Sequence, residues 1–340
     1  ERPTRGIAAL LARTQLDQKS ALSAEDIAYT LGPRLNAAGR LGQAPLAVEL
    51  MTTDSPERGR SLAEYLHELN GSRESLERSI YLAAHKQAQE QFDPERDPAL
   101  VLAARGWHPG VTGIVATRLA EKYHRPVVLI GFDPVDSKPG VGSGRSVPGF
   151  DLHAALAACG DFLVSHGGHA AAAGLKIDAD QLDAFRAAFC EVAASEANCQ
   201  TAVAELQIDA EIPLSALSLA VVEQLERLAP FGSGNGRPLL CASRIQITEP
   251  PRRIGSGQRH LSLKVAQDGV VLRAVAFGAG EWAQELSDHT GPIAIAFRPV
   301  INEYRGRRSV ELHLCDWQPQ DRLLAAGTAA GRPIGAESGP

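Results

Sequence analysis

The stretch GVGSGRSVPGFDLHAALAACGDFLVSHGGHAAAAG, residues 140–174, constrains the fold of this chain more than any other. It opens with three alternate glycines, Gly140, Gly142 and Gly144. Such a pattern excludes a helix, and it lets the backbone approach a ligand or another backbone closely. Ser143 and Arg145 are separated by one residue. On an extended segment their side chains therefore emerge on the same face.

The same stretch carries a second group of glycines. After a short helix, predicted from Asp151 to Cys159, the pair Gly167 and Gly168 precedes His169. A hydroxyl, a guanidinium, backbone N–H groups and an imidazole are together suited to holding a phosphate. The alternative is two tight turns with one polar residue in each, which is the more frequent meaning of either motif alone. Their occurrence together favours the phosphate site.

Composition limits the class of protein. The chain has 340 residues, with 44% hydrophobic and 22% charged, which predicts a globular protein of two or three domains and not a disordered one. No apolar run is long enough for a membrane span. The net charge of −6 is not that of a strongly basic nucleic-acid binder, although local clusters decide contacts. Five scattered cysteines without a C-x-x-C pair indicate reduced thiols in the cytoplasm.

The N-terminal region, residues 1–54, is rich in arginine and helical in tendency. The spacing of Ser23 and Asp26 predicts a capping box. LGPRLNAAGRLG, residues 31–42, is predicted to form a turn between helices. It is either a plain joint with surface arginines or a phosphate clamp, and the chemistry alone favours neither. Because Met51 is the sole methionine, we expect the chain to be a piece of a longer protein whose N-terminal part is missing.

A long helix is predicted next. Ser55 and Pro56 are typical of a helix start, and the helical pattern continues to about Gln91. The apolar stripe consists of Leu62, Leu66, Leu69, Leu76, Ile80 and Ala83. Such a helix would be roughly 50 Å long, which is more than one globular domain needs. It therefore indicates a connector between two lobes.

Residues 96–197 alternate between strand and helix, which predicts a small α/β domain with a mixed sheet. The expected strands are 100–104, 127–131, the glycine-rich segment and 175–177, and the expected helices follow His108 and cover 180–194. His108 lies just before a helix N-terminus, where anions are favoured. A histidine at such a place more often caps the turn.

Residues 198–320 have β character and predict a small barrel of the OB type. Strands are expected at 206–210, 244–248, 260–265, 270–277, 293–304 and 309–317, and helices near 214–228 and 280–286. The last hairpin turns on Arg305 and Gly306 and carries Tyr304, Arg305, Arg307 and Arg308. It is either a single-strand groove with a stacking platform or a solvated tip. The tail, 321–340, is expected to be disordered.

Six blocks occur in a fixed order along this sequence: GPRLNAAGRLG, GWHPGVTGIVATRLAEKYHRPVVLI, GSGRSVPGFDLHAAL, GGHAAAAG, LERLAPFGSGNGRPLL and NEYRGRRSVEL. Together they resemble the bacterial RecJ family, 5′→3′ exonucleases specific for single-stranded DNA that act in repair and recombination. The resemblance covers residues 1–320, nearly the whole chain, and six blocks are far more specific than one glycine motif.

The resemblance implies a fold and a cofactor. Residues 1–54 would end a DHH domain, 55–95 form the linking helix, 96–197 the DHH-associated domain and 198–320 the OB-fold. The complete enzyme would use Mn²⁺ or Mg²⁺ in the DHH domain. No Asp-His-His triplet occurs in this sequence, so no metal ligand is assigned here and the chain alone is expected not to cut DNA.

The resemblance also implies site residues. Ser143, Arg145 and Arg40 would grip the 5′-phosphate, and Asn36 and His169 would orient the scissile phosphate as the catalytic pair. Further contacts to the phosphate or DNA backbone would come from Arg34, His108, Gly167 and Gly168, and those to downstream nucleotides from Tyr304, Arg305, Arg307 and Arg308. The partner would be single-stranded DNA, together with single-strand-binding protein and a repair helicase, for a cytoplasmic monomer away from membranes.

Three alternatives stay open. A DHH-family phosphodiesterase for short RNA or cyclic dinucleotides would share the Gly-Gly-His block but would not need the barrel. A non-catalytic single-strand-binding module is a second reading. The third is a self-contained metal site, which matches no established ligand pattern and would use His166, His169, Asp151, His153 and Asp161.

Overall fold

A computed structural model describes residues 3–93, 96–135, 138–195 and 206–321. The chain divides at residue 205 into two compact units, which are treated separately below. Residues 196–205 and 322–340, the latter including all but the first residue of the tail predicted to be disordered, lie outside the described residues. None of the helices in the described ranges is long and apolar enough to span a membrane.

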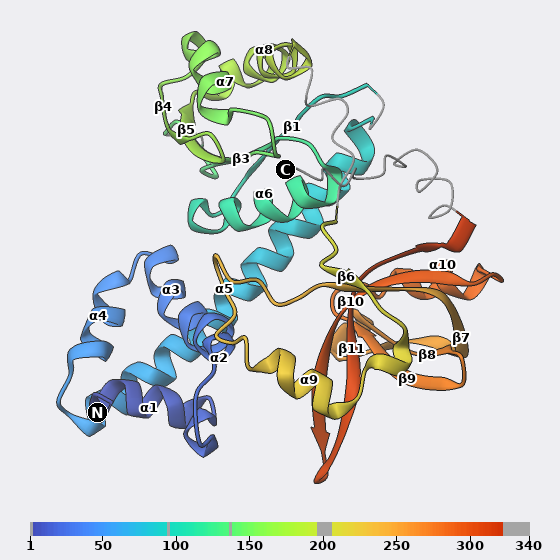
Figure 1. Cartoon of the computed structure of the whole chain (residues 1–340). Helices are drawn as coiled ribbons and strands as arrows, with labels where there is room; N and C mark the ends of the chain where they lie inside the picture. The colour runs from blue at the N-terminus through green and yellow to red at the C-terminus, as the bar shows by residue number, and fades with distance from the viewer. Residues whose placement is uncertain (1–2, 94–95, 136–137, 196–205, 322–340) are drawn as a thin grey trace, which may run out of the picture. The chain divides into compact units, whose positions relative to one another are not determined.

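The first unit begins with short helices that pack on the N-terminal half of one long helix, α5 (Figure 1). Their shared core contains Leu10, Leu50, Leu62 and Leu66. The capping box of Ser23 and Asp26 is formed as predicted. The elements are α1 (Arg5–Arg13), η1 (Leu16–Gln18), α2 (Ala24–Asp26), the π-helical η2 (Ile27–Leu31), α3 (Gly32–Arg40), α4 (Ala44–Thr52) and α5 (Pro56–Gln91).

The turn predicted within residues 31–42 is wrong, because most of that stretch is helix α3. Pro33 lies in the first turn of α3, where a missing N–H and a fixed φ are tolerated. The π-helical segment runs directly into α3 without a break. The chain reverses only after Arg40, where Gly42 has a φ of 77°. The two glycines and the proline therefore did not break the helix.

Helix α5 begins as predicted, with the Ser55 hydroxyl accepting the Arg58 N–H at 3.2 Å. Its apolar stripe differs from the prediction in the C-terminal half: Leu76 and Ala83 are exposed, and Ala84 is buried instead. The reason is that α5 packs against two separate cores. Its first half contributes Leu62, Ala63 and Leu66, and its second half Ile80, Ala84 and Ala88.

A five-stranded mixed sheet follows, in the order β1-β2-β3-β5-β4. The strands are β1 (Leu100–Arg105), β2 (Val127–Phe132), β3 (Gly140–Arg145), β4 (Ser165–His169) and β5 (Ala172–Ile177). Strands β1 and β2 are parallel, and the other pairs are antiparallel. The Gly-Gly-His segment, for which a tight turn was the alternative interpretation, is the edge strand β4 and hydrogen-bonds along β5.

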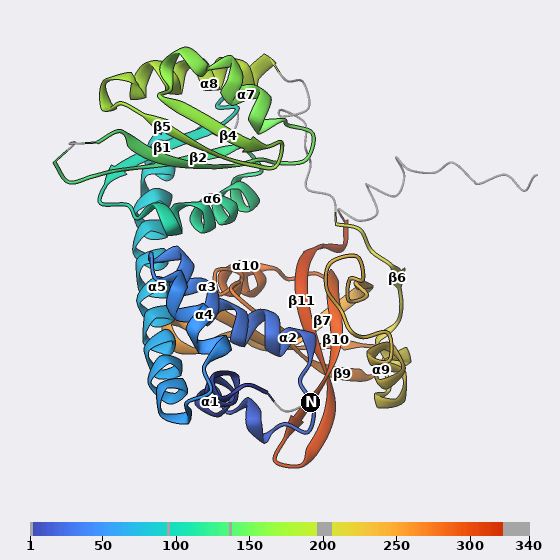
Figure 2. The ribbon, with the colours of Figure 1, turned by 90° about the vertical axis from the view of Figure 1, so that its left-hand side faces the viewer.

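Helices cover both faces of this sheet (Figure 2). Helix α6 (Pro109–Tyr123) lies on one face, and α7 (Leu152–Ala158) and α8 (Leu182–Ser195) lie on the other. The α7–α8 side buries Phe185 and Phe189 against Val128 and Ile130 of β2. The α6 side packs against β1, β2 and the C-terminal half of α5.

The second unit is a five-stranded barrel of the OB type. Its strands are β7 (Leu240–Ile254), β8 (His260–Gln267), β9 (Val270–Ala276), β10 (Ile293–Tyr304) and β11 (Arg307–Pro319). They run in the order β10-β11-β9-β8-β7, and pairing of β10 with β7 closes the barrel. Together with the α/β unit and the long helix, this confirms the predicted fold class.

Two elements near the barrel are shorter than predicted. The strand expected at 206–210 is reduced to β6 (Ala210–Glu211), parallel to β7. The helix expected at 214–228 is a 3-10 turn, η6 (Leu214–Ala216), followed by α9 (Leu219–Glu226). The Ser218 hydroxyl accepts the Val221 N–H at 3.3 Å and starts α9 there. The second predicted helix is α10 (Trp282–Asp288).

Candidate phosphate and nucleic-acid interface

Strand β3 has two unlike faces. Cβ atoms at Gly142 and Gly144 would lie 2.7 Å from Leu175 and 2.9 Å from Leu152, respectively. The glycines therefore make room for side chains of the α7–α8 core. The expectation that they leave the backbone open to a ligand is wrong on this face, because alternate residues of a strand point to opposite sides.

The other face of β3 presents Ser143 and Arg145 to helix α6, which confirms that they share a face. An Nη2 atom of Arg145 lies 2.9 Å from the position that a Cβ of Gly113 would occupy. The Ser143 hydroxyl is hydrogen-bonded to the Thr112 hydroxyl at 3.1 Å. Both predicted phosphate ligands therefore lie against the first two turns of α6, close to its positive N-terminal end.

The N-terminus of α6 is also in contact with α3. A Cβ atom at Gly110 would lie 1.9 Å from the carbonyl oxygen of Arg40. The Arg40 guanidinium donates to the Gly110 carbonyl at 3.2 Å. His108 is the N-cap, and its Nδ1 accepts the Gly110 N–H at 3.1 Å. His108 thus has the capping role that was the plainer of its two interpretations, and its place in substrate binding stays a prediction.

The charge of this region is unbalanced. Burial lowers the pKa of Arg145, and the positive charge of Arg40 lowers it further. Arg145 donates to the Gly144 carbonyl at 2.7 Å. Within the described part of the chain no carboxylate lies within ion-pair distance of Arg145, and Asp151 instead caps α7 through the Ala154 N–H. Two neighbouring guanidiniums at a helix N-terminus favour an anion.

His169 lies in the same row of the sheet as Arg145. Ala172 of β5 is opposite Arg145 on one side and opposite His169 on the other. Directly opposed residues share a face, so His169 is presented on the α6 side, two strand spacings or about 10 Å from Arg145. Gly168, with φ of 144°, leaves no room for a Cβ beside the Ala172 carbonyl, whereas Gly167 faces open space.

A pocket of about 550 Å³ adjoins Arg145 on this face. Its walls come from the C-terminal half of α6 and from the segments after β3 and β4, and include Thr117, Glu121, His124, Ser146, Pro148 and Ala171. The sequence did not single out these residues, although all six lie in the blocks that carry the resemblance, because no polar pattern within those blocks distinguishes them.

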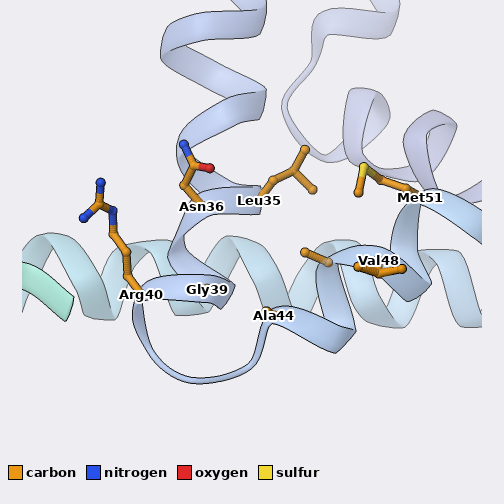
Figure 3. A pocket seen from close by; sticks show the side chains of 8 residues that line it. Leu35, Asn36, Gly39, Arg40, Ala44, Val48 and Met51 are labelled. Atoms are coloured by element: carbon orange, nitrogen blue, oxygen red, sulfur yellow. The ribbon is translucent and has the colours of Figure 1, made fainter. Parts of the chain in front are cut away.

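Asn36 and Arg40 are exposed and lie one helical turn apart on α3, at the edge of a groove of about 470 Å³ between α3 and α4. Figure 3 shows both polar side chains pointing away from the apolar ones, Leu35, Val48 and Met51. They can therefore act on the same ligand from one face of α3.

Arg34 does not join them. Its Nε donates to His67 Nδ1 at 3.2 Å and its Nη1 to the Thr30 carbonyl at 2.5 Å, and burial lowers its pKa. Six residues turn an α-helix by about 240° beyond one full turn, so Arg34 and Arg40 cannot face the same ligand. Arg34 and Arg40 therefore do not form the phosphate clamp that was one of the two interpretations of this segment.

The barrel hairpin turns on Arg305 and Gly306, whose φ values of 52° and 75° suit a two-residue turn with both residues left-handed. Tyr304 is 65% exposed, and the Arg305 guanidinium lies 5.1 Å from the centre of its ring. Arg307 is opposite Tyr304 in the ladder and shares its face. Arg308 is turned to Glu223 of α9, with an ion pair of 2.8 Å. The four predicted residues are therefore divided between two faces.

No group of three or more His, Cys, Asp or Glu side chains is placed to hold a metal ion in the ranges that the structure describes. The self-contained metal site considered above is not formed, although the His153 and His166 rings lie 6.1 Å apart. The described residues thus do not fit the divalent ions that the resemblance implies.

Comparison with known protein families defines the class of domains in this chain. The DHHA1 domain family matches residues 96–195, and the RecJ OB domain family matches residues 208–316. The chain therefore contains a DHHA1-type α/β domain followed by an OB domain of the RecJ type. It belongs to the RecJ family.

Similar proteins and similar solved structures also come from the RecJ family. The chain is 34% identical to the single-stranded-DNA-specific exonuclease RecJ of Dickeya dadantii, over 90% of this chain and 53% of that protein. It is 30% identical to the single-stranded-DNA-specific exonuclease RecJ of Bacillus subtilis, over 86% of this chain and 36% of that protein. The crystal structure of Thermus thermophilus RecJ with Mg²⁺ matches with a TM-score of 0.72 and 29% identity, over 92% of this chain and 46% of that one. The chain thus spans about a third to a half of the relatives it matches.

Proposed function

We propose that this chain supplies the DNA grip of a single-stranded-DNA-specific 5′→3′ exonuclease. One observation carries the proposal: Ser143 and Arg145 share one face of β3 beside Arg40 at the N-terminus of α6, and no carboxylate in the described ranges pairs with Arg145. Relatives named as single-stranded-DNA-specific exonucleases support the substrate class.

The roles follow from charge and position. Arg145 and Ser143 bind the terminal phosphate, because a dianion offers more charge and more free oxygens than an internal phosphodiester. Arg40 adds charge from α3. Asn36 and His169 orient the adjacent, scissile phosphate from the two sides of this cluster. Tyr304, Arg305 and Arg307 of the barrel hold downstream nucleotides.

Solved RecJ structures that resemble this chain contain Mg²⁺ or Mn²⁺. Such ions would activate water and stabilise charge at the phosphate in the complete enzyme. The described residues of this chain do not fit them, so we assign these residues binding and orientation only. We further propose that the protein acts on cytoplasmic DNA as a monomer, alongside single-strand-binding protein and a repair helicase.

The test is the preference of the chain for the end of its DNA. We expect it to bind a short 5′-phosphorylated oligonucleotide about ten-fold or more tightly than the 5′-hydroxyl form, and Arg145→Ala to abolish the difference. Arg186→Ala is the matched control, because Arg186 lies on α8 on the opposite face of the sheet and pairs with Asp183. Equal affinity of the unmodified chain for both ends would contradict the proposal.

A further inference from the structure

The pocket of about 550 Å³ beside Arg145 has no role in the proposed function. Arg145 lines this pocket, whereas Ser143 and Arg40 do not. All of its lining residues lie within the first compact unit. Its volume falls in the range of small-molecule sites, about 300–1,000 Å³. Arg145 therefore stands between the phosphate cluster and a second space that can receive part of a ligand.

The pocket extends along α6, away from the phosphate cluster. The Arg145 guanidinium lies against Gly113, in the first turns of this helix. The pocket wall begins one turn later, at Thr117, and continues to Glu121 and to His124, the C-cap. From Gly113 to His124 the helix rises by about 16 Å. A phosphate bound by Arg145 would therefore have the cluster on one side and the pocket on the other.

The two hydroxyl groups of the pocket are hydrogen-bond acceptors. The Thr117 hydroxyl donates its hydrogen to the Gly113 carbonyl at 3.1 Å. The Ser146 hydroxyl donates to the Phe150 carbonyl at 2.7 Å. A hydroxyl has one hydrogen and two lone pairs, so each of these oxygens can only accept from a ligand. The pocket therefore favours a group that carries N–H or O–H donors.

Charge changes sign along the pocket, from the Arg145 guanidinium at one end to the Glu121 carboxylate on the last turn of α6. The C-terminal end of a helix adds partial negative charge there. Further phosphates beyond the one on Arg145 would be repelled, whereas a neutral group with donors would be bound. The remaining wall is largely apolar and includes Ala120, Val147 and Pro148.

From these contacts we infer that the pocket binds a nucleoside joined to the 5′-phosphate of DNA through a 5′–5′ pyrophosphate bridge. Arg145 binds the bridge. The sugar hydroxyls and the amino group of the base donate to Glu121, Thr117 and Ser146, and the base lies against the apolar wall. Such an end is the product of nucleotidyl transfer to a 5′-phosphate. The inference rests on the proposed function and adds to it a second kind of 5′ end that the DNA grip accepts.

The experiment compares the affinity of the chain for four oligo(dT) molecules that carry fluorescein at the 3′ end and differ only at the 5′ end. These ends are a hydroxyl, a phosphate, a diphosphate and an adenosine joined through a pyrophosphate. We expect the adenylylated end to bind about five-fold or more tightly than the 5′-phosphorylated end. The diphosphorylated end has the same phosphates without the nucleoside, and it should bind no more tightly than the 5′-phosphorylated end.

Substitution of Glu121, which is exposed, tests the role of the pocket itself. Glu121→Ala should lower the ratio of adenylylated to 5′-phosphorylated affinity by about five-fold. Glu121→Lys should make the diphosphorylated end a tighter ligand than the adenylylated one. Glu191→Ala is the matched control, because Glu191 is exposed on α8, on the opposite face of the sheet. Circular dichroism confirms that the variants fold.

The outcomes separate the inference from the proposed function. The inference alone would be overturned if the adenylylated end bound no more tightly than the 5′-phosphorylated or the diphosphorylated end. An unchanged affinity ratio in both Glu121 variants would overturn it as well. If the unmodified chain did not prefer the 5′-phosphorylated end to the 5′-hydroxyl end, the proposed function and the inference would both be contradicted, because both depend on Arg145.

Discussion

The carbonyl oxygen of Arg40 lies so close to Gly110 that a Cβ atom at position 110 would be 1.9 Å from it. The Arg40 guanidinium in turn donates to the Gly110 carbonyl at 3.2 Å. This contact joins the end of α3 to the start of α6. It is what brings the charge of Arg40 close enough to Arg145 to lower the pKa of Arg145.

Gly110→Ala should therefore disrupt this joint. The new methyl group meets backbone, which cannot rotate away, so we expect unfolding free energy to fall by about 1–3 kcal/mol or more. Gly39→Ala is the control on the neighbouring helix, because nothing lies within 4 Å of its Cβ position. It should stabilise α3 by about 0.5–1 kcal/mol. Urea unfolding of both variants checks this, and equal effects would contradict the close contact.

Arg40 and Arg145 should act on the same phosphate. Each single alanine variant is expected to lower affinity for a 5′-phosphorylated oligonucleotide by about ten-fold. The double variant should lose less than the product of the two effects, since residues that share a ligand are coupled. The measurement is a double-mutant cycle by fluorescence anisotropy, with the 5′-hydroxyl oligonucleotide as reference. Strict additivity would place the two guanidiniums on different phosphates.

Elements with local signals could be predicted from the sequence. Ser55 and Pro56 marked the start of α5, and the alternation of strand and helix led to the mixed sheet. Helix α3 could not be predicted, because Pro33 and two glycines are breakers by propensity. Packing against α5 and the position of Pro33 in the first turn overrode that tendency.

The candidate site was predicted only in part. The spacing of Ser143 and Arg145 correctly placed both on one face. Which partner each arginine finds depends on the phase of its helix and on residues far along the chain, and for this reason Arg34 could not be separated from Arg40.

The hairpin arginines should differ in their effect on salt dependence. Replacing Arg307, which shares a face with Tyr304, should reduce the log–log salt slope of oligo(dT) binding by about 0.7. Arg308→Ala should change the slope less, because Arg308 pairs with Glu223. Titrations at several salt concentrations give the slopes. If both variants had the same salt slope as the unmodified chain, the hairpin tip would be only a solvated turn.

Four buried or half-buried thiols predict how the stability of the protein depends on pH. Burial raises the pKa of Cys159, Cys190, Cys241 and Cys315 above the ordinary value of 9.0. The unfolded chain therefore loses these protons at lower pH than the folded protein does. The stabilisation is complete below about pH 9 and is lost as pH rises through the folded-state pKa values.

The check is urea unfolding between pH 8 and pH 10.5. The midpoint should fall above pH 9, and Cys159→Ala should make the fall less steep, because Cys159 is fully buried. Other groups titrate in this range in both proteins, so the difference between the two curves is the quantity of interest. Parallel curves would show that the Cys159 thiol does not contribute.

Strand β3 has a glycine face, whose residues cannot be replaced without disturbing the core, and a polar face, whose residues can be replaced. Positions 140, 142 and 144 are committed to the core, where even a methyl group meets a neighbour. Positions 143 and 145 are half-buried and point to α6, where their polar groups lie beside Thr112 and Gly113. Recognition at this strand could therefore be altered through those two alternate positions while the sheet beneath them is left intact. The ligand bound here could therefore be changed, by evolution or by protein engineering, through substitution of two side chains without a change in the backbone.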